Sequence, residues 1–338
     1  MKAIQAVKPG FMCEIEVEKP KLRSATSVIV KVKAAGICGS DVHIFHGRNP
    51  YVTYPRIMGH EVTGIVEEIG TEVRNFCVGD RVVVEPILYC GTCYPCRIGR
   101  HNVCENLRVY GVHMDGGFAE YMEVEERALH ILPENITFLQ GALIEPYTIG
   151  SQAISRTQVQ EGDICLVHGA GPIGLLTIDL LKSKGAFCIA SELSEPRRKL
   201  AEKFGADIVI DPSEQDLAAE VMQQTQGYGA NVIFDAVGIS TLVEQSIPLL
   251  SGAGRFLEFG YGFGTAKIDF DLVNRRELTV MGVRHQKKQF PPVIENYHTR
   301  LDKVNLLKTH VYSLDNYKEA FRIFEDKASG ACKVVFGL

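Results

Sequence analysis

Four cysteines lie close together in the chain and could hold a metal ion. Cys90, Cys93, Cys96 and Cys104 follow the pattern CxxCxxC, with the fourth cysteine after a further seven residues. Four thiolates suit tetrahedral zinc, and a shell of four sulfurs leaves no open coordination position. The spacing therefore predicts a structural zinc site. A nucleic-acid zinc finger is the alternative, but the segment lacks paired ligands on a helix and a basic domain around it.

The segment HGAGPIG has the spacing of a dinucleotide-binding turn. Gly169, Gly171 and Gly174 form GxGxxG between an expected strand at 164–168 and an expected helix at 172–184. In such a turn the first glycine permits the tight bend, the second lets backbone amides approach a pyrophosphate, and the third lets helix and strand pack closely. Pro172 suits the first turn of the helix. A glycine-rich turn without a ligand is the alternative.

An acid is expected at the end of the next strand, where it would hold the adenosine ribose hydroxyls. Glu192 lies 18 residues after Gly174. Its charge would repel a 2′-phosphate, so the sequence favours NAD over NADP. Arg197 and Arg198 keep NADP open, because a nearby arginine can accept that phosphate; otherwise they are solvated residues of a helical first turn.

A second set of potential metal ligands is dispersed along the first half of the chain. Cys38 lies in GICGSDVH, His60 and Glu61 lie in GHE, and Glu145 lies in LIEPY. Taken singly, they read as a buried thiol, a hydrogen-bonded histidine and surface acids. Their occurrence in one chain with a dinucleotide motif makes them candidates for a second zinc site.

The elements that must position these residues follow two patterns. Up to about residue 150, short strands expected at 27–32, 62–69 and 81–85 indicate a mostly β domain. Beyond it, strands alternate with helices, which predicts parallel βαβ units and a doubly wound sheet. After 283 the pattern loosens, and we expect the tail to return to the first domain and end in a strand at 333–336. The expected domains are 1–150, 151–283 and a C-terminal segment, 284–338. The alternating strands are expected at 164–168, 187–191, 207–210, 232–236 and 255–259, and the helices at 172–184, 195–204 and 214–225.

Composition limits the classes of function. The chain has 338 residues, of which 46% are hydrophobic and 23% charged, with a net charge of −5. These values are typical of globular proteins and disfavour a nucleic-acid partner. No apolar stretch suits a membrane span, and the N-terminus lacks the apolar core of a signal peptide. We therefore expect a cytoplasmic protein without a membrane partner, whose ten cysteines are not a disulfide framework.

Taken together, these motifs resemble the zinc-dependent medium-chain alcohol dehydrogenase superfamily. GICGSDVH, GHEVTGIVEEIG, the four-cysteine segment, DGGFAEY, LIEPYTIG and GAGPIG occur in family order and cover essentially the whole chain. The resemblance implies an α/β protein with a GroES-like, mostly β catalytic domain and a doubly wound Rossmann domain that binds NAD. It also implies two zinc ions per chain, one catalytic and one structural, and a homodimer or homotetramer.

The resemblance assigns roles to individual residues. Cys38 and His60 match ligands of the catalytic zinc, and a third ligand would come from Glu61 or Glu145. Glu61 is also expected to be a catalytic residue. Ser40 and His43 match a relay that carries the substrate's hydroxyl proton through the nicotinamide ribose to solvent. Asp41 is a candidate partner that fixes the tautomer of His60. Cofactor contacts are expected at Gly169, Gly171, Pro172, Ile173, Gly174, Glu192, Arg197, Val237, Phe259, Gly260, Tyr261, Val283 and Arg284.

The substrate class also rests on resemblance. Glu145 stands where liver-type enzymes carry cysteine, and glutamate there is similar to the polyol, threonine and sugar-acid branches. The phrases HGRNPYVTYPRIMGHE, GVHMDGGFAEY and LIEPYTIG look closest to bacterial L-gulonate and L-galactonate 5-dehydrogenases. Oxidation of a sugar-acid hydroxyl is therefore expected, with sorbitol-type or threonine-type activity as the alternative. A sugar acid needs a cation for its carboxylate, and Arg48, His113, Arg284 and Lys287 are candidates.

Two other classes are disfavoured. A non-catalytic descendant of the family would usually lose zinc ligands or the proton relay, and all these positions hold competent residues here. A zinc-free quinone reductase would need neither set of cysteines.

Overall fold

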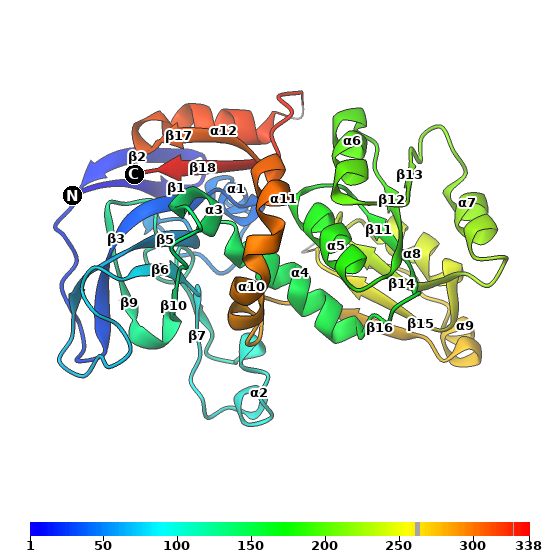
Figure 1. Ribbon diagram of the computed structural model, residues 1–338, viewed down its shortest axis with the longest axis horizontal. Coiled ribbons are helices and arrows are strands. Elements are labelled where there is room, and N and C mark those ends of the chain that lie inside the picture. The colour runs from blue at the N-terminus through cyan, green and yellow to red at the C-terminus, as the bar shows by residue number, and fades with distance from the viewer. Residues whose placement is uncertain (261–263, 327) are drawn as a thin grey trace. The chain divides into compact units, whose positions relative to one another are not determined.

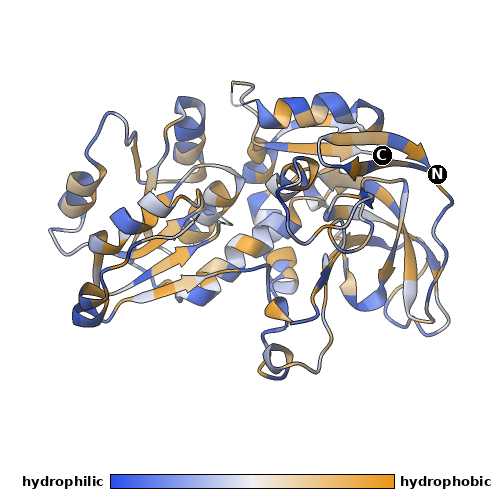
Figure 2. Ribbon diagram, turned by 180° about the vertical axis from the view of Figure 1, so that it is seen from behind, coloured by the Kyte–Doolittle hydropathy of each residue, from blue (hydrophilic) through white to orange (hydrophobic). Residues whose placement is uncertain are grey.

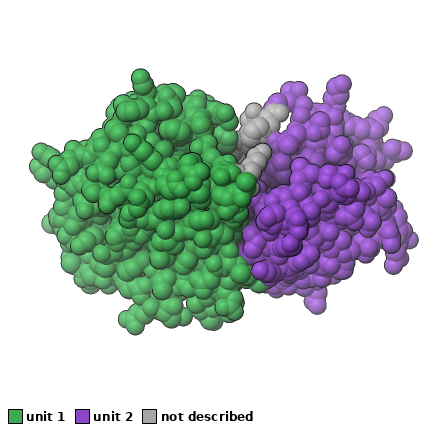
Figure 3. Space-filling model, turned by 90° about the horizontal axis from the view of Figure 1, so that it is seen from above, with its two compact units in different colours: residues 1–145, 287–338 green, residues 146–286 purple. Residues whose placement is uncertain are grey.

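The computed structural model describes residues 1–260, 264–326 and 328–338, and the chain forms two compact units. One unit comprises residues 1–145 and 287–338, and the other comprises residues 146–286 (Figure 3). The domain boundary expected at 150 falls inside a continuous helix, α4 (Ile144–Thr157), so the division lies near the beginning of that helix. The C-terminal segment joins the first unit from Lys287 rather than from residue 284.

The first unit is built mainly from strands (Figure 1). Its largest sheet has the order β10–β6–β5–β3–β18–β17, and β9 also pairs with β3. The long strand β3 (Ser27–Gly36) pairs antiparallel with β5 (Glu61–Ile69) and with β18 (Lys333–Gly337), so the end of the chain completes this sheet. Two smaller sheets have the orders β2–β1–β4 and β7–β8. The remaining strands are β1 (Lys2–Lys8), β2 (Phe11–Glu16), β4 (Arg56–Ile57), β6 (Arg81–Val84), β7 (Ile87–Leu88), β8 (Arg108–Val109), β9 (Tyr121–Glu125), β10 (Leu129–Ile131) and β17 (Lys308–Ser313).

Short helices cover the first unit, including the C-terminal part where the sequence pattern loosens. The amphipathic helix α12 (Tyr317–Glu325) buries Tyr317, Ala320 and Phe321, which lie on one helical face at spacings of three and four residues. Phe321 packs edge-on against Phe118, with ring centroids 6.2 Å apart, in the main core of this unit. The other helices are α1 (Gly39–Phe45), α2 (Tyr94–Arg97), α3 (Phe138–Gly141), α10 (Phe290–Asn296) and α11 (Leu301–Leu307).

The second unit is a parallel sheet of order β13–β12–β11–β14–β15–β16 with helices between its strands. This is the doubly wound, dinucleotide-binding order that the alternating sequence pattern predicts. The strands are largely apolar, as Figure 2 shows, because both faces of the sheet are covered. No described helix is long and apolar enough to cross a membrane. The elements are β11 (Ile164–His168), α5 (Pro172–Ser183), β12 (Phe187–Ser191), α6 (Glu195–Phe204), β13 (Ile208–Ile210), α7 (Leu217–Gln224), β14 (Ala230–Asp235), α8 (Ser240–Ser246), β15 (Leu250–Glu258), α9 (Phe270–Arg276) and β16 (Thr279–Gly282).

Two expectations for this unit need correction. The helix expected from residue 214 begins at Leu217, because Asp216 caps it by accepting a hydrogen bond from the backbone N–H of Ala219. The helix α8 between β14 and β15 was not predicted, because its sequence STLVEQS is too short to show a clear helical period.

The turn between β11 and α5 depends on two glycines. Gly169 has φ +85°, a left-handed conformation that glycine adopts without strain. A Cβ at Gly174 would overlap the carbonyl oxygen of Gly169, so the helix approaches the strand end as closely as a glycine permits. Gly171, by contrast, has open space where a Cβ would stand.

These two glycines give a matched test of the turn. Gly174→Ala should lower the free energy of unfolding by about 1–3 kcal/mol, because the added methyl overpacks the backbone. Gly171→Ala should leave the stability nearly unchanged. Denaturant unfolding of both variants measures the difference, and equal losses would show that close packing at Gly174 does not govern the turn.

Candidate active site

The candidate active site begins where β3 leads into α1. Cys38 is the N-cap residue of α1 and presents its thiol at the helix end. Asp41 is fully buried, and its Oδ2 accepts a hydrogen bond of 2.8 Å from the backbone N–H of Cys38. Its Oδ1 accepts another, of 3.3 Å, from Gly59 on the segment that leads to His60. One carboxylate therefore fixes the two segments that carry the expected zinc ligands.

His60 is buried between Asp41 and Ser40. Its Nδ1 lies 3.6 Å from Asp41 Oδ1, and its Nε2 lies 3.4 Å from Ser40 Oγ. Burial lowers the pKa of His60, but the charges of Asp41 and Cys38 outweigh it and raise the pKa well above its usual value. With Nδ1–H directed at Asp41, Nε2 would be free to bind a metal ion.

Glu61 forms a buried ion pair with Lys333, which the sequence analysis did not single out. The two side chains are 1% and 3% exposed, and the Lys333 ammonium also donates to the carbonyl oxygen of Ile37, 2.9 Å away. Burial lowers the pKa of Lys333, but the negative groups around it, Glu61 first, raise it on balance. The second carboxylate oxygen of Glu61, Oε2, is buried and has no hydrogen-bond partner among the described residues.

Glu145 is buried and interacts electrostatically with His60, Glu61 and Lys333. Burial raises the pKa of its carboxyl to about 7, and the repulsion of Glu61 adds to this effect, whereas His60 and Lys333 lower it. The site thus buries several groups that can be negative around one lysine. Such an excess favours the binding of a further cation.

A zinc ion fits these side chains. Cys38, His60 and Glu61 each offer one ligand atom, and these atoms lie within 4.8 Å of one another. Sulfur, imidazole nitrogen and carboxylate oxygen are the donors that zinc prefers. The structure therefore brings three of the four expected ligands together directly and places Glu145 within electrostatic range of them.

Ser40, His43 and Arg48, expected relay and substrate residues, lie on α1 and the loop that follows it, whereas His113 lies between β8 and β9. His43 is partly buried, and burial, together with the positive charge of Arg48, lowers its pKa. His43 can therefore accept a proton at neutral pH. Arg48 is exposed. His113 Nδ1 accepts a hydrogen bond of 3.1 Å from the backbone N–H of Val109, which leaves its Nε2–H as the donor.

The four cysteines of the CxxCxxC segment also converge. The sulfurs of Cys90, Cys93, Cys96 and Cys104 lie within 4.8 Å of one another around the short helix α2. Hydrogen bonds from Thr92 and Cys93 to the Cys90 sulfur lower the pKa of Cys90 to about 5. A sulfur that already accepts N–H and O–H groups suits the thiolate form that zinc requires.

The Glu192 carboxylate accepts two hydrogen bonds beside the glycine turn of the second unit. Its Oε2 accepts a hydrogen bond of 2.7 Å from Ala170, and its Oε1 accepts one of 2.8 Å from Ser194. Arg198 pairs with Asp211 at 2.8 Å and also donates to the carbonyl oxygen of Glu192. The Arg198 side chain is thus engaged by other groups of the protein. The Arg197 side chain is half-buried and makes no hydrogen bond or ion pair within the described residues.

The other expected cofactor residues follow the carboxyl ends of the strands. Val237 comes after β14, Phe259 and Gly260 come after β15, and Val283 and Arg284 come after β16. Gly169, Gly171, Pro172, Ile173 and Gly174 form the turn and the beginning of α5. Parallel sheets bind ligands at this edge. Tyr261, also expected to contact the cofactor, lies outside the described residues.

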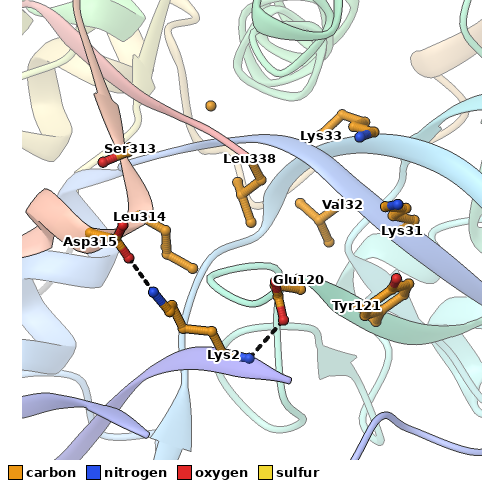
Figure 4. A pocket seen from close by; sticks show the side chains of 11 residues that line it. Lys2, Lys31, Val32, Lys33, Glu120, Tyr121, Ser313, Leu314, Asp315 and Leu338 are labelled. Atoms are coloured by element: carbon orange, nitrogen blue, oxygen red, sulfur yellow. Dashed lines mark hydrogen bonds and ion pairs between the residues drawn. The ribbon is translucent and has the colours of Figure 1, made fainter. Parts of the chain in front are cut away.

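A pocket of about 380 Å³ on the first unit contains none of the expected site residues (Figure 4). Lys2, Lys31 and Lys33 contribute to its lining, and the Lys2 ammonium pairs with Asp315 at 2.6 Å. We do not assign this pocket to the reaction.

Comparison with known protein families identifies the class of protein. Residues 24–134 match the alcohol dehydrogenase GroES-like domain, and residues 172–299 match the zinc-binding dehydrogenase family. The chain belongs to the zinc-dependent medium-chain alcohol dehydrogenase superfamily, with a GroES-like domain and a Rossmann domain. Zinc and a nicotinamide cofactor are properties of this class.

Two relatives are similar over almost the whole chain. The starvation-sensing protein RspB of Escherichia coli is 37% identical over 99% of this chain and 98% of its own length. The L-threonine 3-dehydrogenase of Pyrococcus horikoshii is 38% identical over 100% of this chain and 99% of its own length.

Two solved structures are similar over the whole chain. An alcohol dehydrogenase (rspB) from Escherichia coli CFT073 with NADH has a TM-score of 0.94 and 36% identity, covering 100% of this chain and 99% of that one. A zinc-binding dehydrogenase from Sinorhizobium meliloti 1021 with NADP has a TM-score of 0.93 and 31% identity, with the same coverage. Structural neighbours therefore bind either nicotinamide dinucleotide.

The two cysteine sites should respond differently to serine substitution. Cys38→Ser should abolish turnover and leave the fold and the zinc of the four-cysteine site. Cys93→Ser should lower the unfolding temperature, because structural zinc contributes folding free energy. Zinc content, circular dichroism and turnover distinguish the two variants. A fully active Cys38→Ser protein would show that Cys38 is not a ligand of the catalytic zinc.

Proposed function

We propose that this protein oxidises a secondary hydroxyl of a sugar acid, L-gulonate or L-galactonate at C5, to a keto-hexonate and transfers the hydride to NAD. The observation that carries the oxidoreductase part is the convergence of Cys38, His60 and Glu61 in a buried site with excess negative charge. The sugar-acid part rests on the sequence phrases around His60, His113 and Glu145. Activity on a sorbitol-type polyol or L-threonine is the second candidate, and an L-threonine 3-dehydrogenase among the relatives favours it.

In the proposed mechanism, Cys38 and His60 would hold the catalytic zinc, with Glu61 or Glu145 as the third ligand, and Cys90, Cys93, Cys96 and Cys104 would hold the structural zinc. Bound zinc supplies Lewis-acid chemistry that acidifies the substrate hydroxyl. Asp41 orients His60. Bound NAD would supply the hydride acceptor. Ser40 would accept the hydroxyl proton of the substrate, and His43 would deliver that proton to solvent.

A sugar acid also places a carboxylate in the site, and a cation must accompany it. Arg48 is an exposed guanidinium whose charge reaches His43, and no acidic partner of Arg48 is present among the described residues. His113 and Arg284 are the other proposed substrate contacts. A guanidinium suits a carboxylate, because both can form two parallel hydrogen bonds.

The test is a screen of hexonates, alditols and L-threonine with NAD, followed by Arg48→Ala and Arg284→Ala. The arginine that holds the carboxylate should, when removed, raise KM for a hexonate by roughly 30-fold or more. A neutral alditol makes no such pair and serves as the control substrate. Equal losses on both substrates would assign the arginine to the cofactor. A preference of the unmodified enzyme for sorbitol or L-threonine over every hexonate would refute the sugar-acid assignment.

Cofactor choice gives a separate prediction. The unmodified enzyme should have a far higher kcat/KM with NAD than with NADP, because the charge of Glu192 opposes a 2′-phosphate and Arg198 is committed to Asp211. Glu192→Ser combined with Leu193→Arg should narrow this gap. Steady-state kinetics with both cofactors measure it. Similar efficiencies in the unmodified protein would place Glu192 away from the ribose.

We further propose a cytoplasmic enzyme that assembles as a homodimer or homotetramer. The four cysteines of the CxxCxxC segment converge as metal ligands, which a reducing compartment would favour. The edge strand β16 exposes Val280, which suits pairing with another chain.

A further inference from the structure

Three ionisable side chains form a row across the carboxyl edge of the parallel sheet. His168, Asp235 and Glu258 end β11, β14 and β15, and the strand register pairs His168 with Asp235 and Asp235 with Glu258. In-register residues of parallel strands present their side chains on the same face. Two residues earlier on that face stand Ile233 and Phe256, both in the buried core. The row therefore caps this core beside the turns expected to hold the cofactor.

His168 is uncharged and does not neutralise the acids. It is 1% exposed, and its Nε2 lies 2.9 Å from Ser246 Oγ. The Ser246 hydroxyl donates its proton to the carbonyl oxygen of Leu242 at 2.6 Å, so it must accept from the His168 Nε2–H. Burial lowers the pKa of His168 to about 4, although Asp235 opposes the effect. His168 therefore leaves the repulsion between the two carboxyls in place, and a proton on Glu258 would remove it.

Each carboxyl is tied to the turn that follows its own strand. Asp235 is fully buried, and its Oδ1 accepts hydrogen bonds from the backbone N–H groups of Val237, at 2.8 Å, and Gly238, at 3.1 Å. Its Oδ2 is buried with no hydrogen-bond partner among the described residues. Glu258 Oε1 accepts from the N–H of Gly260 at 2.5 Å. The two acids therefore set the positions of both turns.

The turn after β14 and the turn after β15 also touch each other. A Cβ at Gly260 would lie 2.5 Å from Gly238 Cα, and a Cβ at Gly169 would lie 2.8 Å from the Val237 side chain. The spacing between the two carboxyls is thus linked to the shape of the glycine turn.

Few other charges act on this pair. Burial, followed by the negative charge of Asp235, raises the pKa of Glu258 to about 7. The sequence of β16, TVMG, contains no charged residue. Glu244, the acid of α8, accepts a hydrogen bond from the backbone N–H of Lys267 instead. Among the described residues, Asp235 is therefore the charged group that most raises the pKa of Glu258, after the effect of burial.

We propose that Glu258 is protonated and donates its O–H to Asp235 in the cofactor-bound protein, so that binding of a nicotinamide dinucleotide is coupled to uptake of a proton from solvent. Two ionised carboxylates would repel each other, separate the turns and also repel the incoming diphosphate. With Glu258 protonated, its O–H can donate to Asp235 while both turns keep their hydrogen bonds. The inference rests on the proposed cofactor contacts of Val237, Phe259 and Gly260.

The coupling has a definite sign. Binding raises the pKa of Glu258 above its value in the free protein, so affinity is highest where Glu258 of the free protein is already protonated. Kd for NADH should be constant below about pH 6 and should rise above about pH 7, by up to roughly tenfold per pH unit. The rise ends when the pH exceeds the pKa of Glu258 in the complex.

The experiment is NADH titration by calorimetry and fluorescence between pH 6 and pH 9, without substrate. For the unmodified protein, Kd should rise at least about tenfold over this range. Glu258→Gln should bind at pH 9 nearly as tightly as at pH 6, because a neutral amide can accept from Gly260 and donate to Asp235. Glu258→Leu should bind weakly at every pH, because it can do neither.

Two matched controls test whether other carboxyl groups cause the pH dependence of NADH binding. Glu202→Gln, at an exposed position on α6, and Glu214→Gln, at an exposed position before α7, should both keep the pH dependence of NADH binding. Calorimetry of the unmodified protein in two buffers with different heats of ionisation should show net proton uptake near pH 7.5.

A pH-independent Kd, no proton uptake, or a Glu258→Gln variant with the pH dependence of the unmodified protein would each overturn the inference. Failure of the unmodified protein to bind NADH at any pH would instead overturn the cofactor assignment itself.

Discussion

The buried ion pair between Lys333 and Glu61 is the interaction on which the first unit depends. The Lys333 ammonium reaches from β18 to Glu61 at the beginning of β5 and to the carbonyl oxygen of Ile37, the residue before Cys38. One cation thus joins the end of the chain to both segments that carry candidate zinc ligands. Removing one partner of a buried pair typically costs about 3–5 kcal/mol, because the other charge is left unpaired. The site is therefore complete only when the last strand has entered the sheet.

In both units, buried or half-buried carboxyls hold backbone segments at strand ends. Each accepts hydrogen bonds from backbone N–H groups that follow a strand and that otherwise would be left unpaired. This arrangement places a carboxyl group beside segments expected to contact zinc or cofactor. The acids and the residues that donate to them are Asp41 with Cys38 and Gly59, Glu192 with Ala170 and Ser194, Asp235 with Val237 and Gly238, and Glu258 with Gly260.

Local spacing in the sequence was sufficient to predict the parallel sheet, the glycine turn and the convergence of Cys90, Cys93, Cys96 and Cys104. It did not reveal Lys333, because a lysine that opens the apolar segment KVVFG looks like an ordinary solvated residue. Its partner Glu61 lies 272 residues away, and the two meet because β18 and β5 both pair with β3. Glu258 was overlooked for a similar reason: strand register, which the sequence does not show, places it beside Asp235.

The central claim is that the metal ion held by Cys38 and His60 is required for hydride transfer to the nicotinamide cofactor. The most direct measurement is dialysis of the enzyme against a chelator, with zinc content, far-ultraviolet circular dichroism and NADH formation followed together. The account predicts that NADH formation stops when the more exchangeable zinc is lost, that the fold persists, and that added zinc restores activity. Continued NADH formation by a folded, zinc-free protein would contradict it.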